Sequence, residues 1–281
     1  MQFIKMQGAG NDFVLIDARS LEHDWGGLAR VMCHRRFGVG ADGILLLLPS
    51  KVADFRMRMF NPDGSEGEAC GNGLRCFARY LVENGLARGL ELKIETVAGI
   101  RAAQVPYRGG HISKIRVGMG VPRFAPAEIP MAADAPVGRA VSRVIDYPIE
   151  AGGRRLKVTC LSLGNPHAVA FLNEPVGEFP LEEVGPRVEH HHLFPNRVNF
   201  EIVNIGGDRV VARVWERGAG ETLACGSGTC AIAVAARLHN LIGDKVDIIL
   251  PGGTLTVEWD GHGEVFLSGP AETVFRGEWP G

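Results

Sequence analysis

The sequence predicts an α+β protein of two pseudo-symmetric halves, each a curved mixed or antiparallel sheet wrapped around a central helix. Three observations predict this fold. A cysteine followed by a Gly-Xaa-Gly turn occurs at Cys70 and again at Cys225, an offset of 225 − 70 = 155 residues. Gly-Asn segments at Asn11 and Asn165 precede the two turns with an offset of 165 − 11 = 154. Many short alternating segments and 38 glycines indicate a strand-rich, turn-rich chain.

Strands are expected where alternating or β-branched segments are bounded by turn residues. The clearest are 92–97, 210–215 and 254–259, and the apolar run 44–48 is typical of a buried strand.

Two helices are expected, each beginning at a cysteine turn. The first covers about 72–82 and stops at Asn84-Gly85, a helix C-terminal signal. The second covers about 227–239 and is apolar nearly all round, so we expect it to be enclosed on most sides.

The predicted domain boundary lies in the Pro-rich stretch 121–130. The last dozen residues lie beyond the second repeat, so we expect them to return to the first half. The predicted domains are residues 1–120 with 270–281, which carry Cys70, and 121–269, which carry Cys225.

Composition excludes several classes of protein. The 281 residues are 46% hydrophobic with a formal net charge of −2, which disfavours an electrostatic nucleic-acid binder. The N-terminus lacks the pattern of a signal peptide, and the longest apolar run is too short to span a bilayer. We therefore expect a cytoplasmic protein that binds neither membrane nor nucleic acid.

The six cysteines are expected to be reduced thiols in this compartment. Cys33 and Cys160 lie among apolar residues and are predicted to be inert core residues, while Cys76 and Cys230 are predicted to face inward on the two helices.

The two cysteine turns predict proton transfer at a carbon. Gly-Xaa-Gly after a cysteine lets the chain enter a helix with its first amides exposed. Those amides and the helix dipole favour negative charge, so we expect each thiol to be biased toward thiolate and the amides to bind a substrate carboxylate. One thiolate could then remove an α-proton while the opposite thiol supplies a new one. Neither repeat contains a lysine for a pyridoxal Schiff base, so the chemistry is expected to need no cofactor and no metal.

The halves differ at two titratable positions. His167 corresponds to Phe13 (167 − 13 = 154) and Glu216 corresponds to Asn61 (216 − 61 = 155). The second half therefore supplies an imidazole and a carboxylate that can help the thiols gain and lose protons. The run 190–192, three histidines, has no repeat partner and is expected to be exposed.

Motifs in both halves, from Lys5 to Phe275, resemble those of diaminopimelate epimerases. The matching segments are KMQGAGNDF (5–13), FNPDGSE (60–66), ACGNG (69–73), GNPH (164–167), RVN (197–199), ERGAGET (216–222), ACGSG (224–228), LPGG (250–253) and LSGPA (267–271).

The resemblance implies cofactor-independent interconversion of LL- and meso-2,6-diaminopimelate in bacterial lysine and peptidoglycan precursor synthesis. It implies that Cys70 and Cys225 are the acid/base pair, with His167 assisting the first and Glu216 the second. It also implies that one set of groups binds the reacting carboxylate, namely the backbone amides of Gly71, Asn72, Gly226 and Ser227. A second set would bind the amino groups and the distal carboxylate, namely Asn11, Asn61, Asn165, Asn199, Glu216 and Arg217.

One position departs from the family pattern. Some members carry a glutamine that contacts substrate where this chain has Gly43, so water or a neighbouring side chain must replace that contact, or it is dispensable. Two alternatives stay open: a proline or hydroxyproline racemase, which substrate profiling would identify, and a thiol switch or zinc protein, for which the cysteine spacing is wrong. The sequence also leaves open whether the chain forms a homodimer.

Overall fold

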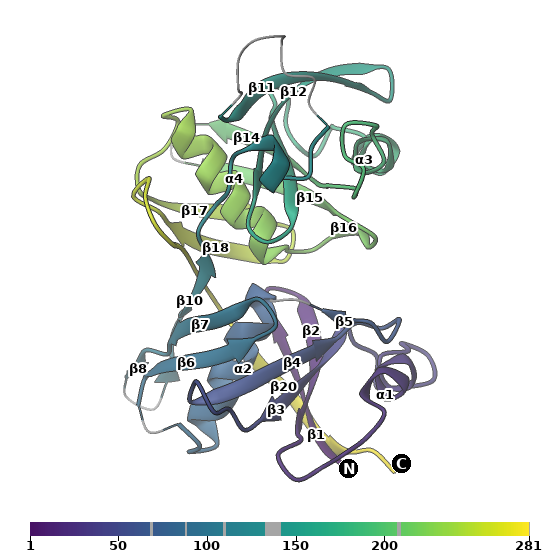
Figure 1. Cartoon of the computed structure of the whole chain (residues 1–281), viewed down its shortest axis with the longest axis vertical. Helices are drawn as coiled ribbons and strands as arrows, with labels where there is room; N and C mark the ends of the chain where they lie inside the picture. Colours follow the sequence, from purple (N-terminus) through teal and green to yellow (C-terminus); the bar gives the residue numbers. More distant parts are fainter. Residues whose placement is uncertain (68–69, 88, 109–110, 133–141, 207–208, 281) are drawn as a thin grey trace. The chain divides into compact units, whose positions relative to one another are not determined.

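A computed structural model describes residues 1–67, 70–87, 89–108, 111–132, 142–206 and 209–280. Glu68 and Ala69 of the first cysteine motif lie outside the described residues. The chain divides into two compact units (Figure 1): unit 1 is Met1–Gly118 with Ser268–Gly281, and unit 2 is Met119–Leu267. Both units are rich in strands and contain few helices, so the predicted α+β class is confirmed.

Unit 1 contains mixed parallel and antiparallel strands and two helices. Its elements are β1 (Gln2–Gly8), β2 (Asn11–Asp17), α1 (Trp25–Met32), β3 (Gly43–Leu48), β4 (Phe55–Phe60), β5 (Glu66–Gly67), α2 (Gly71–Glu83), β6 (Glu91–Thr96), β7 (Gly99–Gln104), β8 (Tyr107–Arg108), β9 (His111–Ile112) and β20 (Glu272–Glu278). The strand β20 pairs antiparallel with β1, with Phe275 opposite Lys5. The chain passes from one unit to the other within β10 (Ile115–Gly120) and β19 (Val265–Gly269).

Unit 2 repeats this plan. Its elements are η1 (Pro126–Glu128), β11 (Val144–Ala151), β12 (Arg154–Ser162), β13 (Pro166–Phe171), α3 (Leu181–Glu189), β14 (Asn199–Gly206), β15 (Arg209–Glu216), β16 (Gly220–Thr222), α4 (Gly226–Leu238), β17 (Lys245–Leu250) and β18 (Gly253–Glu258). The predicted strands correspond to β3, β6, β15 and β18 and are confirmed to within a residue or two.

The two predicted helices, α2 and α4, are also confirmed, and each is the central helix of its unit (Figure 1). In unit 1, α2 packs against β1, β2, β3, β4, β7 and β20. In unit 2, α4 packs against β12, β13, β14, β17 and β18. As predicted from its apolar surface, α4 is buried along most of its length, at Ala231, Val234 and Ala235 among others. Burying apolar surface on every side of a helix is what makes it the core of its half.

Strand register extends the repeat beyond the sequence motifs. In unit 1, β2 and β3 are parallel and Phe13 pairs with Gly43. In unit 2, β13 and β14 are parallel and His167 pairs with Asn199. Counting two residues further along each second strand therefore makes Glu201 the counterpart of Leu45.

Two short helices, α1 and α3, carry no signal that the sequence analysis used. Gly26 and Gly27 lower the helix propensity of α1, although Asp24 caps it by accepting from the Gly27 amide at 3.0 Å. The helix α3 contains Pro186, which predicts a break. Within the described ranges, no helix has the length and apolar character needed to cross a membrane.

Candidate active site

In unit 1, Cys70 lies at the N-cap of α2 beside two asparagines. Its Sγ accepts from the Gly73 amide at 3.5 Å and lies 3.6 Å from Asn11 Oδ1. Asn72 Nδ2 donates to the same Asn11 oxygen at 3.1 Å. The fold thus brings three predicted site residues together: Asn11, Cys70 and Asn72.

A network of charges holds Asn11 in this position. Asn11 Nδ2 donates to Asp42 Oδ2 at 2.6 Å, and Arg35 binds both Asp42 (2.6 Å) and Asp12 (2.8 Å). Lys5 pairs with Asp12 at 2.6 Å. Burial alone would raise the pKa of Asp12, but hydrogen bonds from Arg35 and Lys5 hold it at about 2. Asp42 is not among the residues predicted from the sequence, where its only signal is its place in the segment before Gly43.

In unit 2, Cys225 caps α4 in the same way but is buried, at 6% exposed. Its Sγ accepts from the Gly228 amide at 3.3 Å and lies 3.5 Å from Ser227 Oγ. Asn165 Nδ2 donates to that hydroxyl at 3.2 Å. Unit 2 thus joins the same three positions as unit 1, with Ser227 in the place of Asn72, but the sulfur contacts Ser227 here, whereas in unit 1 it contacts Asn11.

The expectation that this thiol is biased toward thiolate is wrong for Cys225. Burial raises the pKa of the Cys225 thiol well above its usual 9.0, and the nearby negative charge of Glu216 raises it further. Hydrogen bonds from Ser227 and the Gly228 amide oppose these effects without outweighing them. Cys225 therefore needs a base to remove its proton.

Glu216 is the carboxylate that can serve Cys225. Its carboxyl group lies close enough to the Cys225 thiol for each group to influence the pKa of the other, and Thr222 Oγ1 donates to Oε1 at 2.6 Å. Burial raises the pKa of Glu216, so the carboxyl group and the thiol both hold their protons more tightly than they would in water. A pair of this kind can exchange one proton between carboxyl and sulfur.

His167 lies on β13 and its partner is a residue that the sequence analysis missed. Its Nδ1 lies 2.7 Å from Glu201 Oε1, and its Nε2 lies 2.9 Å from Asn165 Oδ1. His167 and Glu201 are both 0% exposed. The signal for Glu201 in the sequence is a single charged residue inside the apolar strand Asn199–Gly206.

The remaining predicted binding residues are placed less uniformly. Asn199 is buried, where it donates to Pro166 O at 2.9 Å and accepts from the Arg217 amide at 2.9 Å, so both ends of its side-chain amide are engaged within unit 2. The Arg217 residue is exposed, and its Nη1 donates to Asn196 O at 3.3 Å. Asn61 is half-buried in a turn, where its Nδ2 donates to Ser65 Oγ at 3.0 Å.

The four predicted amides begin the two central helices. Gly71 and Asn72 are the first residues of α2, and Gly226 and Ser227 are the first residues of α4. Amides at these positions have no partner within the helix ladder and point along the axis toward its N-terminal end, where an anion can bind.

The other cysteines are in the core, as predicted. Cys33, Cys76, Cys160 and Cys230 are at most 3% exposed. Burial raises the pKa of Cys33 to about 11 and that of Cys76 to about 12, which favours the protonated thiol near neutral pH.

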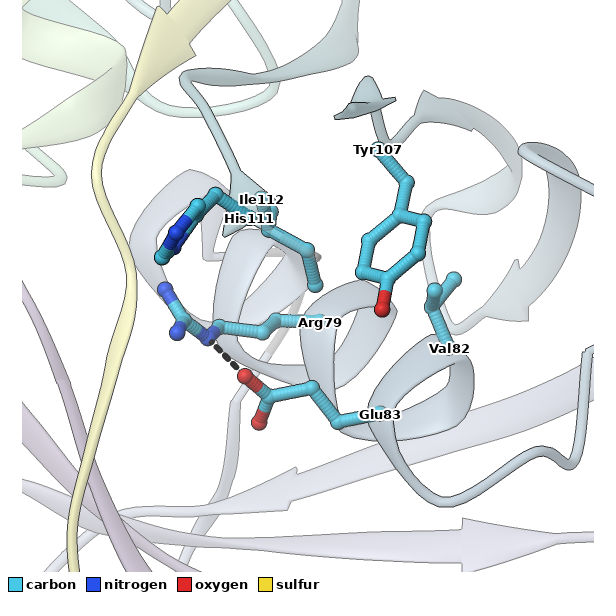
Figure 2. A pocket seen from close by; sticks show the side chains of 6 residues that line it. All are labelled: Arg79, Val82, Glu83, Tyr107, His111 and Ile112. Carbon is cyan, nitrogen blue, oxygen red and sulfur yellow. Dashed lines mark hydrogen bonds and ion pairs between the residues drawn. The ribbon is translucent and has the colours of Figure 1, made fainter. Parts of the chain in front are cut away.

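Other features of the described residues lie away from the two cysteine turns. No group of three or more His, Cys, Asp or Glu side chains in the described part of the chain could hold a metal ion. His190 and His192 are exposed and His191 is half-buried. A pocket of about 340 Å³ in unit 1 (Figure 2) lies beside the C-terminal half of α2, where Arg79 and Glu83 pair at 2.8 Å, and contains none of the predicted site residues.

Comparison with known proteins relates both halves of the chain to one family. A family model described as diaminopimelate epimerase matches residues 3–125 and 159–274. The chain is 51% identical to the diaminopimelate epimerase of Moorella thermoacetica, covering 100% of this chain and 99% of the relative. It is 48% identical to that of Desulforudis audaxviator, covering 99% of each.

Solved structures share the fold at low sequence identity. A hydroxyproline epimerase from Agrobacterium vitis is similar with a TM-score of 0.70 and 18% identity, covering 99% of this chain and 90% of that one. A protein from Pseudomonas aeruginosa described as a predicted epimerase is similar with a TM-score of 0.68 and 18% identity, covering 100% of this chain and 99% of that one. These likenesses support the fold.

Proposed function

Because the chain belongs to the diaminopimelate epimerase family, we propose that it interconverts LL- and meso-2,6-diaminopimelate with two cysteines as acid and base, without a cofactor. The observation that carries the proposal is the repeated cysteine turn. Cys70 and Cys225 each cap a central helix with the same backbone geometry, and each accepts from the amide three residues on.

The reaction requires the two thiols to serve opposite faces of one α-carbon. In one direction, a thiolate takes the α-proton from carbon, and the other thiol donates its own proton to the opposite face of the carbanion. The C–H bond that breaks is replaced by a new C–H bond, and the two sulfurs exchange their protonation states. Glu216 prepares Cys225 by taking or returning its proton, and His167 is proposed to serve Cys70.

The charge that develops on the substrate needs stabilisation, because removal of the α-proton leaves a carbanion next to a negatively charged carboxylate. We propose that the first-turn amides at Gly71, Asn72, Gly226 and Ser227 bind the reacting carboxylate. The amino groups and the distal carboxylate would be bound by Asn11, Asn61, Asn165, Asn199, Glu216 and Arg217. Arg217 suits a carboxylate and Glu216 suits an ammonium group, which a substrate with a second charged head requires.

The proposal also covers the cellular compartment, the pathway, the domains and the oligomeric state of the enzyme. The substrate is a small amino acid made in the cytoplasm for lysine and peptidoglycan precursors. The functional domains would be residues 1–120 with 270–281 and residues 121–269. We also propose that the chain forms a homodimer. Sedimentation equilibrium tests this: twice the chain mass supports a homodimer, and once the chain mass contradicts it.

Turnover of purified protein tests the function. LL-diaminopimelate is incubated with enzyme freed of metals by a chelator and without added cofactor, and the isomers are separated by chromatography. Appearance of the meso isomer supports the proposal. Activity on proline or hydroxyproline in its place would overturn it in favour of the racemase alternative.

A further inference from the structure

Glu201 is a buried carboxylate behind His167 in unit 2. Its Oε1 lies 2.7 Å from His167 Nδ1, and neither side chain is exposed. The parallel register of β13 and β14 produces this contact, because Glu201 lies two residues beyond the partner of His167 and so on the same face. Its other oxygen, Oε2, has no hydrogen-bond partner among the described residues. Burial raises the pKa of Glu201, and the imidazole opposes that shift.

Unit 1 folds in the same way without such a pair. The corresponding residues are Phe13 and Leu45, both 0% exposed and apolar. Replacing a buried polar pair by apolar residues of similar volume is often neutral or stabilising. Folding alone therefore does not require His167 and Glu201, and their presence in only one of the two halves indicates a role in the chemistry.

A continuous series of contacts leads from His167 and Glu201 to the Cys225 thiol. His167 Nε2 lies 2.9 Å from Asn165 Oδ1, and Asn165 Nδ2 donates to Ser227 Oγ at 3.2 Å. Ser227 Oγ in turn lies 3.5 Å from Cys225 Sγ. Because an amide oxygen only accepts, Nε2 carries a hydrogen in this arrangement, and the 2.7 Å contact between Nδ1 and the Glu201 carboxyl group requires one further proton, on the ring or on the carboxyl group.

Glu201 also lies close to the cysteine turn itself. A Cβ added at Gly228 would lie 2.8 Å from Glu201 Oε1 and 3.3 Å from Cys225 Sγ. At the matching Gly73 the nearest atom would be a methyl group of Leu45, at 3.2 Å. The carboxylate is therefore packed between the imidazole and the turn that presents the thiol.

We propose that Glu201 is a positioning residue for the reaction. It fixes the ring of His167 with Nδ1 toward the Glu201 carboxyl group and Nε2 toward Asn165. It also balances the positive charge of the ring when His167 is protonated. This inference rests on the proposed epimerase function. The titratable groups that face Glu201 are Cys160 on β12, His167 on β13, Glu216 on β15 and Cys225 at the start of α4.

The variant E201Q tests the proposal, since it keeps the shape of the side chain and removes its charge. We expect kcat/KM to fall by about 10- to 100-fold, as for other groups that orient a histidine, with the loss in kcat and little change in KM. Without the carboxylate an imidazolium loses its proton more readily, so the limb of the pH–rate profile that reports this pair should move to lower pH. E189Q is the control: Glu189 is a second buried carboxylate of unit 2, bonded to Trp215 Nε1 at 2.8 Å. It should leave the pH profile unchanged, even if stability falls.

A double-variant series separates positioning from folding. In an H167F background E201Q should change kcat/KM by less than about twofold, because its effect acts through the ring. H167F/E201L installs the residue pair of unit 1 and should unfold at a temperature no lower than H167F, without recovering activity. An E201Q loss that is the same in both backgrounds would overturn the proposal.

A readout without substrate distinguishes this inference from the proposed function. In protein labelled with ¹⁵N-histidine, the ring nitrogens of His167, assigned with H167F, should show Nδ1 engaged in the wild type and altered in E201Q. A wild type inactive on LL-diaminopimelate would defeat the proposed function whatever this spectrum shows. An active wild type whose pH profile and His167 spectrum are the same in E201Q would defeat the inference alone.

Discussion

The two cysteine turns share a backbone and differ in what surrounds the sulfur. Cys70 caps α2 with φ −107° and ψ 119°, and Cys225 caps α4 with φ −108° and ψ 118°. Beside Cys70 lie two amide side chains, Asn11 and Asn72, which do not titrate. Beside Cys225 lie a hydroxyl group and the carboxyl group of Glu216. The repeated backbone sets the position of each thiol at the N-cap of its helix. The neighbouring side chains, which differ between the two units, decide how each thiol exchanges its proton.

The support behind each turn differs in the same sense. Asn11 is held by Asp42 and Arg35, whose side chains are 38% and 60% exposed. Its counterpart Asn165 contacts the fully buried pair of His167 and Glu201. Ion pairs near water contribute little free energy and are screened by salt, whereas a buried charged pair responds strongly to loss of either partner. Substitutions behind the turn should therefore be more damaging in unit 2 than in unit 1.

Loss of either cysteine is expected to have the largest effect, because both halves are needed. C70A and C225A should each lower kcat by more than about 10⁴-fold, since each removes the acid for one direction and the base for the other. C33A, a buried core cysteine of unit 1, is the matched control and should keep most of the activity. Substantial turnover in either single variant would show that the halves are not both required.

The next largest effect is expected at the titratable position that only unit 2 has. E216Q should lower kcat by about 10²- to 10⁴-fold, because Cys225 loses the group that exchanges its proton. At the matching position of unit 1, N61A should act mainly by raising KM. Steady-state kinetics on both variants compares them directly, and a larger loss of kcat in N61A would contradict the assignment.

Two glycines allow a comparison of packing. G228A places a methyl group 2.8 Å from Glu201 Oε1, which His167 holds in place, so we expect it to lower the free energy of unfolding by about 1–3 kcal/mol. G73A meets a Leu45 methyl group at 3.2 Å, which can yield, and alanine favours the helix by about 1 kcal/mol. Urea unfolding of both variants should show G73A near the wild type. Equal destabilisation would mean that the two turns are packed alike.

The smallest effect is expected from removing a charge in the network of Lys5, Asp12, Arg35 and Asp42 in unit 1. Unit 2 has Pro166 at the position of Asp12. The pKa of Asp12 is held at about 2 against an ordinary 3.8, and because solvent screens the exposed partner Arg35, the ionised form stabilises the folded state by only about 1 kcal/mol at neutral pH. Because the folded pKa is the lower one, this stabilisation is complete above about pH 4 and is lost as the pH falls toward 2. D12N should therefore be less stable than the wild type at pH 7, with the difference shrinking below pH 4. A constant difference across that range would show that Asp12 acts through shape and not charge.

Local sequence signals predicted the parts of the fold that repeat. The Cys-Gly-Xaa-Gly turns located α2 and α4 because a glycine-rich turn, an N-cap and a run of helix-forming residues coincide there. The helices α1 and α3 contain residues of low helix propensity, Gly27 and Pro186, so local sequence does not predict them. Packing in the folded chain is what stabilises them.

Two features of the site depend on tertiary structure and could not be predicted. The contact of Glu201 with His167 arises from the register of two parallel strands that are about thirty residues apart, which no local motif encodes. The raised pKa of Cys225 arises from burial and a nearby carboxylate, whereas the sequence shows only the helix N-terminus that favours thiolate. Asn199 was predicted as a binding residue by position, yet its side chain also links two segments of unit 2.

The most direct measurement is the fate of deuterium during the first turnovers of LL-diaminopimelate in D₂O, followed by NMR and mass spectrometry at low conversion. If one thiol removes the α-proton and the other delivers a solvent-derived one, the meso product should carry deuterium at the inverted carbon, while the remaining LL substrate should still carry protium. Meso product that retains the original protium, or deuterium entering the LL substrate before product forms, would show that a single group serves both faces and would contradict the two-cysteine account.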